Sequence, residues 1–208
     1  MSVFSAAALC FPAMSVLFVL FKQNAYSHRF SPALARCFKG GATFFAFLLG
    51  LFGLVRNYST AGLLVCLGVL IGAIADVVLD IHFNAGACVF ALGHVCYGAG
   101  FILYAPPSIP QFILLFVLTE LVCFSFIKGH DRLEARFQPF TLYALVLCAI
   151  LALGVFQKPV LACGCVLFVL SDALLAKNIV LGSTRLSEYI SLGTYYLAQF
   201  LIGLSLCL

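Results

Sequence analysis

Charged side chains are scarce in this sequence: they make up 9% of its 208 residues, whereas a soluble domain has about 25%. Hydrophobic residues make up 64%, which excludes a water-soluble globular domain and predicts a polytopic membrane protein. A membrane-crossing helix needs about 20 apolar residues, so eight spans use most of the chain. We therefore expect a single all-α integral membrane domain over residues 1–208, with about eight transmembrane helices in one bundle and no separate soluble domain.

Metal-binding and targeting signals are also missing. The chain has ten cysteines, but none of the spacings typical of structural zinc sites occurs. We expect the cysteines to pack as small hydrophobic side chains, with no metal and no other cofactor. The first apolar run lacks the basic segment and the cleavage site of a signal peptide, so we expect it to be retained. The net charge of +4 comes from loop lysines and arginines and does not predict a nucleic-acid partner.

The apolar runs predict where the spans lie. The uncharged stretch from Phe83 to Thr119 is too long for one helix, and Pro106, Pro107 and Pro110 are expected to divide it in two. The predicted spans are 3–21, 38–55, 61–81, 84–104, 109–127, 139–156, 159–178 and 187–207.

The basic residues indicate how these spans are oriented. The loops on one side carry every lysine and arginine except Arg56 and Lys158. The positive-inside rule places that side in the cytoplasm, so both termini are expected to be non-cytoplasmic. The expected location is the endoplasmic reticulum membrane in a eukaryotic cell and the inner membrane in a bacterium.

Two aspartates within the apolar runs, Asp76 and Asp172, carry most of the functional information. A charged side chain at bilayer depth costs at least roughly 2.5–3.5 kcal/mol, so each needs a partner or a water-filled cavity. A rise of 1.5 Å per residue places both about 8 Å below the cytoplasmic boundary. Other polar residues are expected in the same half of the bundle, and we predict that they line a cavity open to that leaflet: Asp80, His94, Tyr97, Glu120, Tyr195, Tyr196 and Gln199.

These residues also have purely structural interpretations. Asp76 and Asp172 can serve as hydrogen-bonded structural groups, Asp80 can be solvated near the boundary, and Glu120 can be half of an ion pair. A lone buried histidine such as His94 is often only hydrogen-bonded, and the polar side chains of the last span can join helices. Gly68 and Gly72 form a Gly-x-x-x-Gly face, which predicts close helix packing.

The two halves of the chain resemble each other weakly. The segment around Asp76 is similar to the segment around Asp172, about half the chain further on. Each is followed by a helix that contains tyrosine, at Tyr97 and at Tyr195 and Tyr196. This pattern predicts a weak parallel repeat of spans one to four and five to eight, with chance similarity between apolar helices as the alternative.

Several short blocks of residues follow one another in order from about Lys39 to the C-terminus. They are Lys39 in the first block, then Asp76, Phe83, Gly86, Phe90, His94 and Tyr97, then Ser171 and Asp172, and finally Tyr195, Tyr196 and Gln199. Together these blocks resemble the YhhN family of membrane proteins, which includes the lysoplasmalogenases. Ala75 stands where the family has glycine and Gly40 where it has proline, so the Lys39 block matches least well.

The resemblance implies hydrolysis of the vinyl ether of a lysoplasmalogen to a fatty aldehyde and glycerophosphocholine or glycerophosphoethanolamine. Such a bond is cleaved by protonation of its β-carbon and attack of water on the resulting oxocarbenium ion, which calls for an acid and a carboxylate. We predict that Asp76 and Asp172 supply this catalytic pair, with either one as the acid. The predicted lysophospholipid-binding residues are Lys39, which would pair with the phosphate, Asp80, His94, Tyr97, Glu120, Ser171, Tyr195, Tyr196 and Gln199.

Other functional classes stay open. A zinc-dependent membrane amidase or receptor-like hydrolase needs about three ligands, and His94 is the one deep histidine. A lipid or small-molecule transporter would also carry acidic residues within the membrane. A lipid-binding regulator without activity would share the same fold. Release of aldehyde from a lysoplasmalogen separates the hydrolase from the carrier and the regulator.

Overall fold

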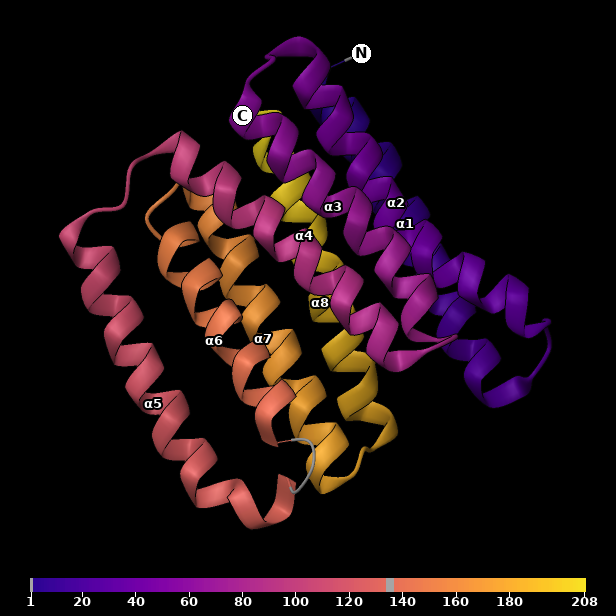
Figure 1. Ribbon diagram of the computed structural model, residues 1–208. Coiled ribbons are helices and arrows are strands. Elements are labelled where there is room, and N and C mark those ends of the chain that lie inside the picture. Colours follow the sequence, from indigo (N-terminus) through magenta and orange to yellow (C-terminus); the bar gives the residue numbers. More distant parts are fainter. Residues whose placement is uncertain (1, 134–136) are drawn as a thin grey trace.

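The computed structural model describes residues 2–133 and 137–208, the side chains of residues 125–139 excepted. The described residues form eight helices and no strand, so the all-α prediction is confirmed (Figure 1). The helices are α1 (Val3–Ser27), α2 (Pro32–Arg56), α3 (Thr60–Leu79), α4 (Phe83–Tyr104), α5 (Ile109–Leu133), α6 (Phe137–Gly154), α7 (Pro159–Leu181) and α8 (Arg185–Ser205).

Polar residues and prolines set the helix ends. The Ser31 hydroxyl accepts a hydrogen bond from the backbone N–H of Leu34, and Pro32 occupies the first position of α2, where its missing N–H costs nothing. The predicted division by prolines is confirmed, because α4 ends before Pro106 and α5 begins after Pro107. Helices α1 and α2 are longer than the predicted spans. Their polar end segments, outside the apolar runs, are also helical.

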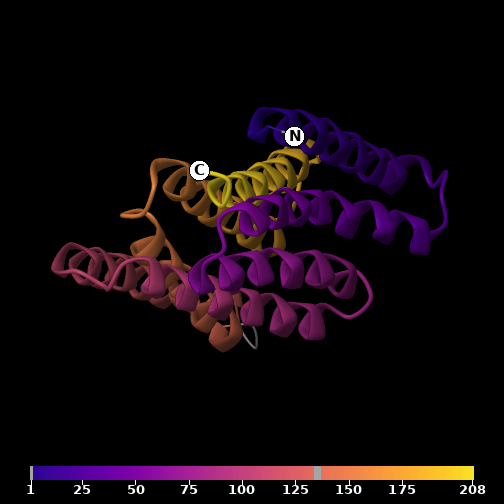
Figure 2. The same ribbon diagram turned by 90° about the horizontal axis from the view of Figure 1, so that it is seen from above.

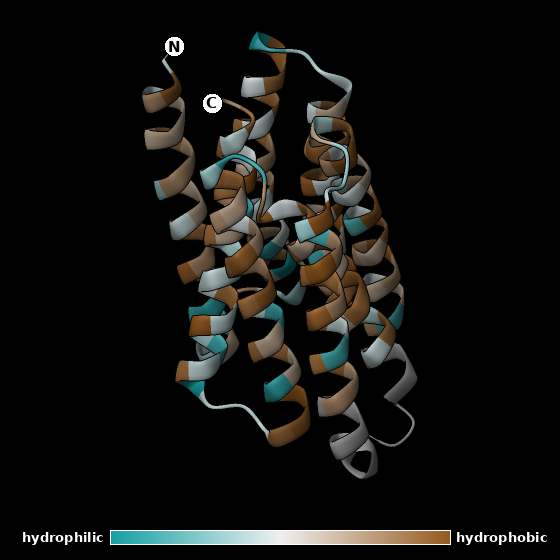
Figure 3. Ribbon diagram, turned by 90° about the vertical axis from the view of Figure 1, so that its left-hand side faces the viewer, coloured by the Kyte–Doolittle hydropathy of each residue, from teal (hydrophilic) through white to brown (hydrophobic). Residues whose placement is uncertain are grey.

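The composition of the helices is that of an integral multi-pass membrane protein. Helices α1 to α4 and α7 are long and apolar enough to cross a membrane, and α5 and α6 contain shorter apolar segments. Figure 3 shows hydrophobic residues along most of the ribbon, with hydrophilic positions at helix ends, in loops and inside the bundle. Helix α8 is less apolar because it carries several of those interior polar residues, among them Tyr195 and Gln199.

Helix α8 lies in the middle of the bundle, where it contacts α1, α2, α3 and α7 (Figures 1 and 2). Both termini lie at one end, and the α1–α2, α3–α4 and α7–α8 loops lie at the other. Most of the basic residues flank those loops, as predicted, although the side chains of Lys128, Arg132 and Arg136 are outside the described part.

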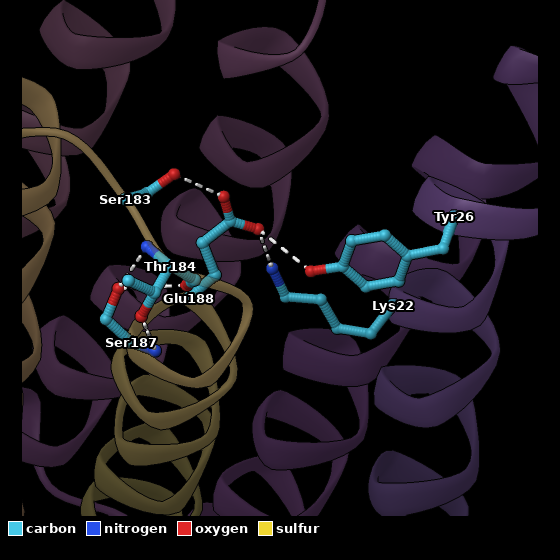
Figure 4. Close-up of polar contacts among 6 residues, drawn as sticks. All are labelled: Lys22, Tyr26, Ser183, Thr184, Ser187 and Glu188. Atoms are coloured by element: carbon cyan, nitrogen blue, oxygen red, sulfur yellow. Dashed lines mark hydrogen bonds and ion pairs between the residues drawn. The ribbon is translucent and has the colours of Figure 1, made fainter.

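A polar cluster near the loop end joins α1 to the start of α8 (Figure 4). The Lys22 ammonium lies 3.2 Å from a Glu188 carboxylate oxygen, to which the Tyr26 hydroxyl also donates at 3.3 Å. Ser183 donates to the other oxygen of Glu188 at 2.7 Å. Because Lys22 is only 7% exposed, this ion pair satisfies a cation that the bundle would otherwise bury alone.

Glycines allow the inner helices to approach closely. A Cβ at Gly68 of α3 would lie 2.5 Å from the Tyr97 ring of α4, and one at Gly72 would lie 3.1 Å from Nε2 of Gln199 in α8. The close packing predicted from the Gly-x-x-x-Gly face is confirmed. The same glycines bring α4 and α8 against the α3 face that carries Asp76.

Candidate active site

Asp76 is buried at the junction of α2, α3 and α8, with 3% of its surface exposed. One carboxylate oxygen accepts hydrogen bonds from the Thr43 hydroxyl at 2.5 Å and the Tyr195 hydroxyl at 3.0 Å. The Gln199 amide donates to the Tyr195 hydroxyl at 3.3 Å, and the Tyr97 hydroxyl donates to the Gln199 carbonyl oxygen at 2.7 Å. Three predicted site residues on α4 and α8 thus form one hydrogen-bonded chain that ends at Asp76.

Asp172 is buried in the other half of the bundle, on α7, with 6% of its surface exposed. The Tyr143 hydroxyl of α6 donates to it at 2.5 Å. The Tyr143 ring also lies edge-on to His94, with ring centroids 5.7 Å apart. Ring contacts from Tyr143 through His94 and Phe168 to Tyr195 therefore connect the surroundings of the two aspartates.

Sequence reasoning missed Thr43 and Tyr143, whose hydroxyls donate to Asp76 and Asp172 respectively. Each donor lies on the helix that precedes its aspartate: α2 before α3, and α6 before α7. These helices occupy equivalent places in the predicted repeat, although the repeat itself stays a prediction. The two donors do not lie at matching positions of the two halves, so the repeat pattern alone does not single them out.

Between the two aspartates lie five aromatic side chains, which we call the aromatic group: Phe90, His94, Tyr97, Phe168 and Tyr195. The His94 ring lies edge-on to Phe168, with centroids 5.0 Å apart, and Phe168 lies edge-on to Tyr195 at 5.7 Å. Phe90 packs 5.8 Å from both Phe168 and Tyr195. The interior between the carboxyl groups is therefore apolar and aromatic.

His94 is the least satisfied polar group of this interior. It is 2% exposed, and Nδ1 lies 2.8 Å from the Phe90 carbonyl oxygen. A carbonyl oxygen only accepts, so Nδ1 carries the hydrogen and Nε2 presents a lone pair when the ring is neutral. Among the described residues, no hydrogen-bond partner reaches Nε2. A buried acceptor of this kind suits a small donor molecule.

Two predicted site residues support helix packing. Ser171 and Ser191 each donate from the hydroxyl to the other's backbone carbonyl, at 2.9 and 3.0 Å, and so join α7 to α8. Tyr196 donates to the Lys39 carbonyl oxygen at 3.1 Å, which joins α8 to α2. These contacts fix the helices that carry Asp172 and Lys39.

Lys39 and Asp80 lie one helical turn further toward the loop end than Asp76. The Lys39 ammonium is 2.6 Å from the Asp80 carboxylate, and their side chains are 13% and 29% exposed. The pair therefore borders the buried site from the water-accessible side.

The structure does not bring Glu120 to the aspartates. Helix α5 lies at the edge of the bundle and packs against α6, and the Glu120 side chain is exposed (Figure 1). It forms no hydrogen bond or ion pair with any residue that the structure describes. Hydropathy predicts how deep Glu120 lies along its helix, but packing decides which side of α5 faces the bundle interior.

The arrangement supplies carboxyl groups and hydroxyls, but it does not resemble a metal centre. Within the described ranges, no three histidine, cysteine, aspartate or glutamate side chains converge as metal ligands do. A buried carboxyl pair in an aromatic interior is suited to moving protons and to stabilising a cation.

Comparison with known proteins supports the sequence resemblance. Lysoplasmalogenase TMEM86B of Rattus norvegicus is 32% identical over 124 residues, which cover 59% of this chain and 52% of that protein. Lysoplasmalogenase TMEM86B of Mus musculus is 30% identical over 123 residues, 59% of this chain and 53% of that protein. The alignments thus span about half the length of these curated relatives. No solved structure matches the chain.

The family assignment rests on a longer match. The family model for YhhN matches residues 34–206, from the start of α2 to the end of α8. That stretch contains both aspartates and the Thr43, Tyr143 and Tyr195 hydroxyls that contact them. The chain therefore belongs to the YhhN family.

Proposed function

We propose that this protein is a lysoplasmalogenase, which hydrolyses the vinyl ether of a lysoplasmalogen to a fatty aldehyde and glycerophosphocholine or glycerophosphoethanolamine. The observation that carries the proposal is the pair of buried carboxyl groups, Asp76 and Asp172, separated by the aromatic group. The relatives named lysoplasmalogenase support it over the aligned half of their length.

The surroundings of the two aspartates support different roles for them. Two hydroxyls donate to Asp76, so negative charge is better stabilised there than at Asp172. Asp172 receives one hydroxyl, from Tyr143. We assign Asp172 as the acid that protonates the β-carbon of the vinyl ether and Asp76 as the carboxylate that faces the oxocarbenium ion.

Water completes the reaction. It attacks the carbon of the oxocarbenium ion and transfers a proton to Asp76, which forms a hemiacetal. The hemiacetal collapses, its hydroxyl proton passing to the departing glycerol oxygen, and releases the aldehyde. The proton on Asp76 then returns to Asp172. The Nε2 atom of His94 is suited to accept a hydrogen bond from the attacking water, since it lies in the aromatic group with no partner among the described residues.

The remaining predicted site residues have supporting roles. Tyr97, Gln199 and Tyr195 orient the Asp76 carboxylate through their hydrogen-bonded chain. The faces of the aromatic group stabilise the positive charge of the oxocarbenium ion. Lys39 and Asp80 lie where the polar part of the lipid would enter, and Ser171 and Tyr196 hold α7 and α2 against α8.

Aldehyde release tests the proposal directly. The purified protein in detergent is incubated with a lysoplasmalogen, with the saturated alkyl ether of the same chain length, and with an ester lysolipid. Only the vinyl ether should yield aldehyde, because only its double bond can be protonated to an oxocarbenium ion. Binding of all three lipids without aldehyde release would contradict the hydrolase and favour a carrier or a lipid-binding regulator.

A further inference from the structure

A cavity of about 480 Å³ opens at the loop end of α1, α2 and α3. Its charged and polar lining comes from Asn24, His28, Arg36 and Asp80, and Phe30 supplies an aromatic wall. The cavity therefore contains a fixed positive charge and a fixed negative charge in one space. An apolar acyl chain alone would not require either.

We propose that this cavity binds the zwitterionic headgroup of the lysolipid, phosphoethanolamine or phosphocholine. The inference rests on the proposed function and assigns the polar half of the same substrate. The phosphate contacts Arg36 and His28, and the terminal ammonium contacts Asp80 and the face of Phe30. A carboxylate beside an aromatic ring is suited to a primary or a quaternary ammonium.

The cationic side of the cavity is available for a ligand. Neither the Arg36 guanidinium nor the His28 ring forms a hydrogen bond or ion pair with another described residue, and Arg36 is partly buried. An arginine fork binds phosphate oxygens in a bidentate manner. His28 adopts the left-handed conformation (φ 50°) at the end of α1, which places it at the turn that borders the cavity.

The anionic side joins the cavity to the Lys39 pair. The Asp80 carboxylate that lines the cavity also accepts from the Lys39 ammonium, at 2.6 Å. The ammonium of a bound zwitterion can share this carboxylate with Lys39 while the phosphate contacts Arg36 and His28.

The distance between the cavity and the carboxyl site suits a lysoplasmalogen. Asp80 follows Asp76 by one turn of α3, a rise of about 6 Å. In the lipid, five single bonds separate phosphorus from the vinyl ether oxygen, roughly 6 Å when extended. A headgroup held at the level of Asp80 therefore places the reacting bond at the level of Asp76.

The test measures binding without turnover. The full chain, purified in a maltoside detergent that carries no phosphate, is titrated with 1-O-alkyl-glycerophosphocholine, which has no vinyl ether to hydrolyse. Parallel titrations use 1-O-alkyl-glycerol 3-phosphate, 1-O-alkylglycerol and inorganic phosphate. The readout is the dissociation constant from thermal-shift titration.

Four variants test the cationic and the anionic side of the cavity separately. Arg36→Gln should weaken both alkyl phospholipids about tenfold and leave alkylglycerol unchanged, because a charge-assisted contact to phosphate is lost. Arg36→Lys should retain most of the affinity. Asp80→Asn should weaken the phosphocholine lipid but not the phosphate lipid. Arg185→Gln is the matched control: its guanidinium lies over the Tyr26 ring at the same end of the bundle and does not line the cavity.

Several results would overturn the inference. The first is that Arg36→Gln and Arg185→Gln bind the phosphocholine lipid with equal affinity. The second is that Asp80→Asn weakens both phospholipids equally. The third is that inorganic phosphate competes as strongly as the phosphocholine lipid. The last result would assign the cavity to free phosphate. If the variants change the dissociation constants as expected but no aldehyde is released from a lysoplasmalogen, the cavity assignment stands and the hydrolase is contradicted. Aldehyde release that does not depend on Arg36 would contradict only the cavity assignment.

Discussion

At the residue scale, the interior is organised by hydroxyl groups that contact two carboxyls. Thr43 and Tyr195 share one oxygen of Asp76, and Tyr143 contacts Asp172. Each hydroxyl comes from a helix other than the one that carries the aspartate, so the contacts also join helices. The same bonds that satisfy the buried carboxyl groups thus hold α2 and α8 against α3 and α6 against α7.

The aspartate pair can be tested by replacing each carboxyl with an amide. Asp76→Asn and Asp172→Asn should each lower kcat by about 10²–10⁴-fold, because asparagine keeps size and hydrogen bonding but cannot transfer the proton or stabilise a cation. The double variant should be little slower than the slower single variant, since groups that act as a unit are non-additive. Rates are measured as aldehyde release, with size-exclusion elution as the folding control. A folded Asp172→Asn protein with near-normal turnover would contradict the mechanism.

His94 can be tested with two opposite replacements. His94→Phe keeps the aromatic packing and removes the Nε2 acceptor, whereas His94→Gln keeps an acceptor and removes the ring. If Nε2 positions water, His94→Phe should lower kcat by about 10²-fold and His94→Gln by less. The reverse order of rates would show that the ring contributes through packing with Phe90 and Phe168.

Glu120 provides a further test at this scale. Its side chain is exposed on α5, at the edge of the bundle and away from both aspartates. Glu120→Gln should therefore leave aldehyde release within about twofold of the unaltered protein, as substitutions of exposed residues usually do. A loss of kcat as large as that of Asp76→Asn would return Glu120 to the site.

At the scale of elements, small residues and polar contacts decide how closely the helices pack. Lipid tails are as apolar as the helix surfaces, so helix association depends on close approach and interhelical hydrogen bonds. Gly68 and Gly72 allow α3 to meet α4 and α8, and the Ser171–Ser191 contact joins α7 to α8. Helix α8 thus holds the two halves of the site in register.

Gly68 and Gly193 form a matched pair for testing this packing, because both are helical glycines. A Cβ at Gly68 would lie 2.5 Å from the Tyr97 ring, whereas a Cβ at Gly193 would lie 3.6 Å from the Phe18 ring, an ordinary contact. Gly68→Ala should destabilise the protein by about 1–3 kcal/mol through overpacking. Gly193→Ala should leave stability unchanged or raise it by up to about 1 kcal/mol through helix propensity. Thermal unfolding in detergent compares the two, and equal Tm values would contradict the assigned α3–α4 packing.

At the scale of the whole molecule, we propose that the basic loop end faces the cytoplasm and that both termini face the other side. The positive-inside rule supports this orientation, and both termini lie at the end opposite the basic α1–α2 loop (Figure 1). The carboxyl site would then open toward the cytoplasmic leaflet, where the proposed headgroup cavity also lies.

Cys37 reports on this orientation because its side chain is exposed near the start of α2. A membrane-impermeant maleimide should label it from the cytoplasmic side of sealed vesicles, and Cys37→Ser should remove that label. A tag at either terminus should be protected from a protease added on the same side. Labelling of Cys37 only from the opposite side would reverse the orientation and the leaflet from which substrate enters.

The sequence by itself determined the helices and the two central carboxyls. Apolar runs ended by Ser31, the prolines near 106 and the polar loops predict all eight helices, because every backbone group within a bilayer must be hydrogen-bonded inside its own segment. An acid such as Asp172 stands out in an apolar run for the same reason that it must be partnered: burying its charge alone is costly.

Only the tertiary structure decided which polar residues meet. In a membrane helix both the lipid-facing and the core-facing sides are apolar, so hydropathy does not reveal which face turns inward. For that reason the sequence did not reveal that the Glu120 side chain is exposed on α5, and it left Thr43 and Tyr143 unnoticed. Close packing at glycines and the position of α8 determine which side of each helix faces the bundle interior. Both depend on contacts between helices that are far apart in the chain.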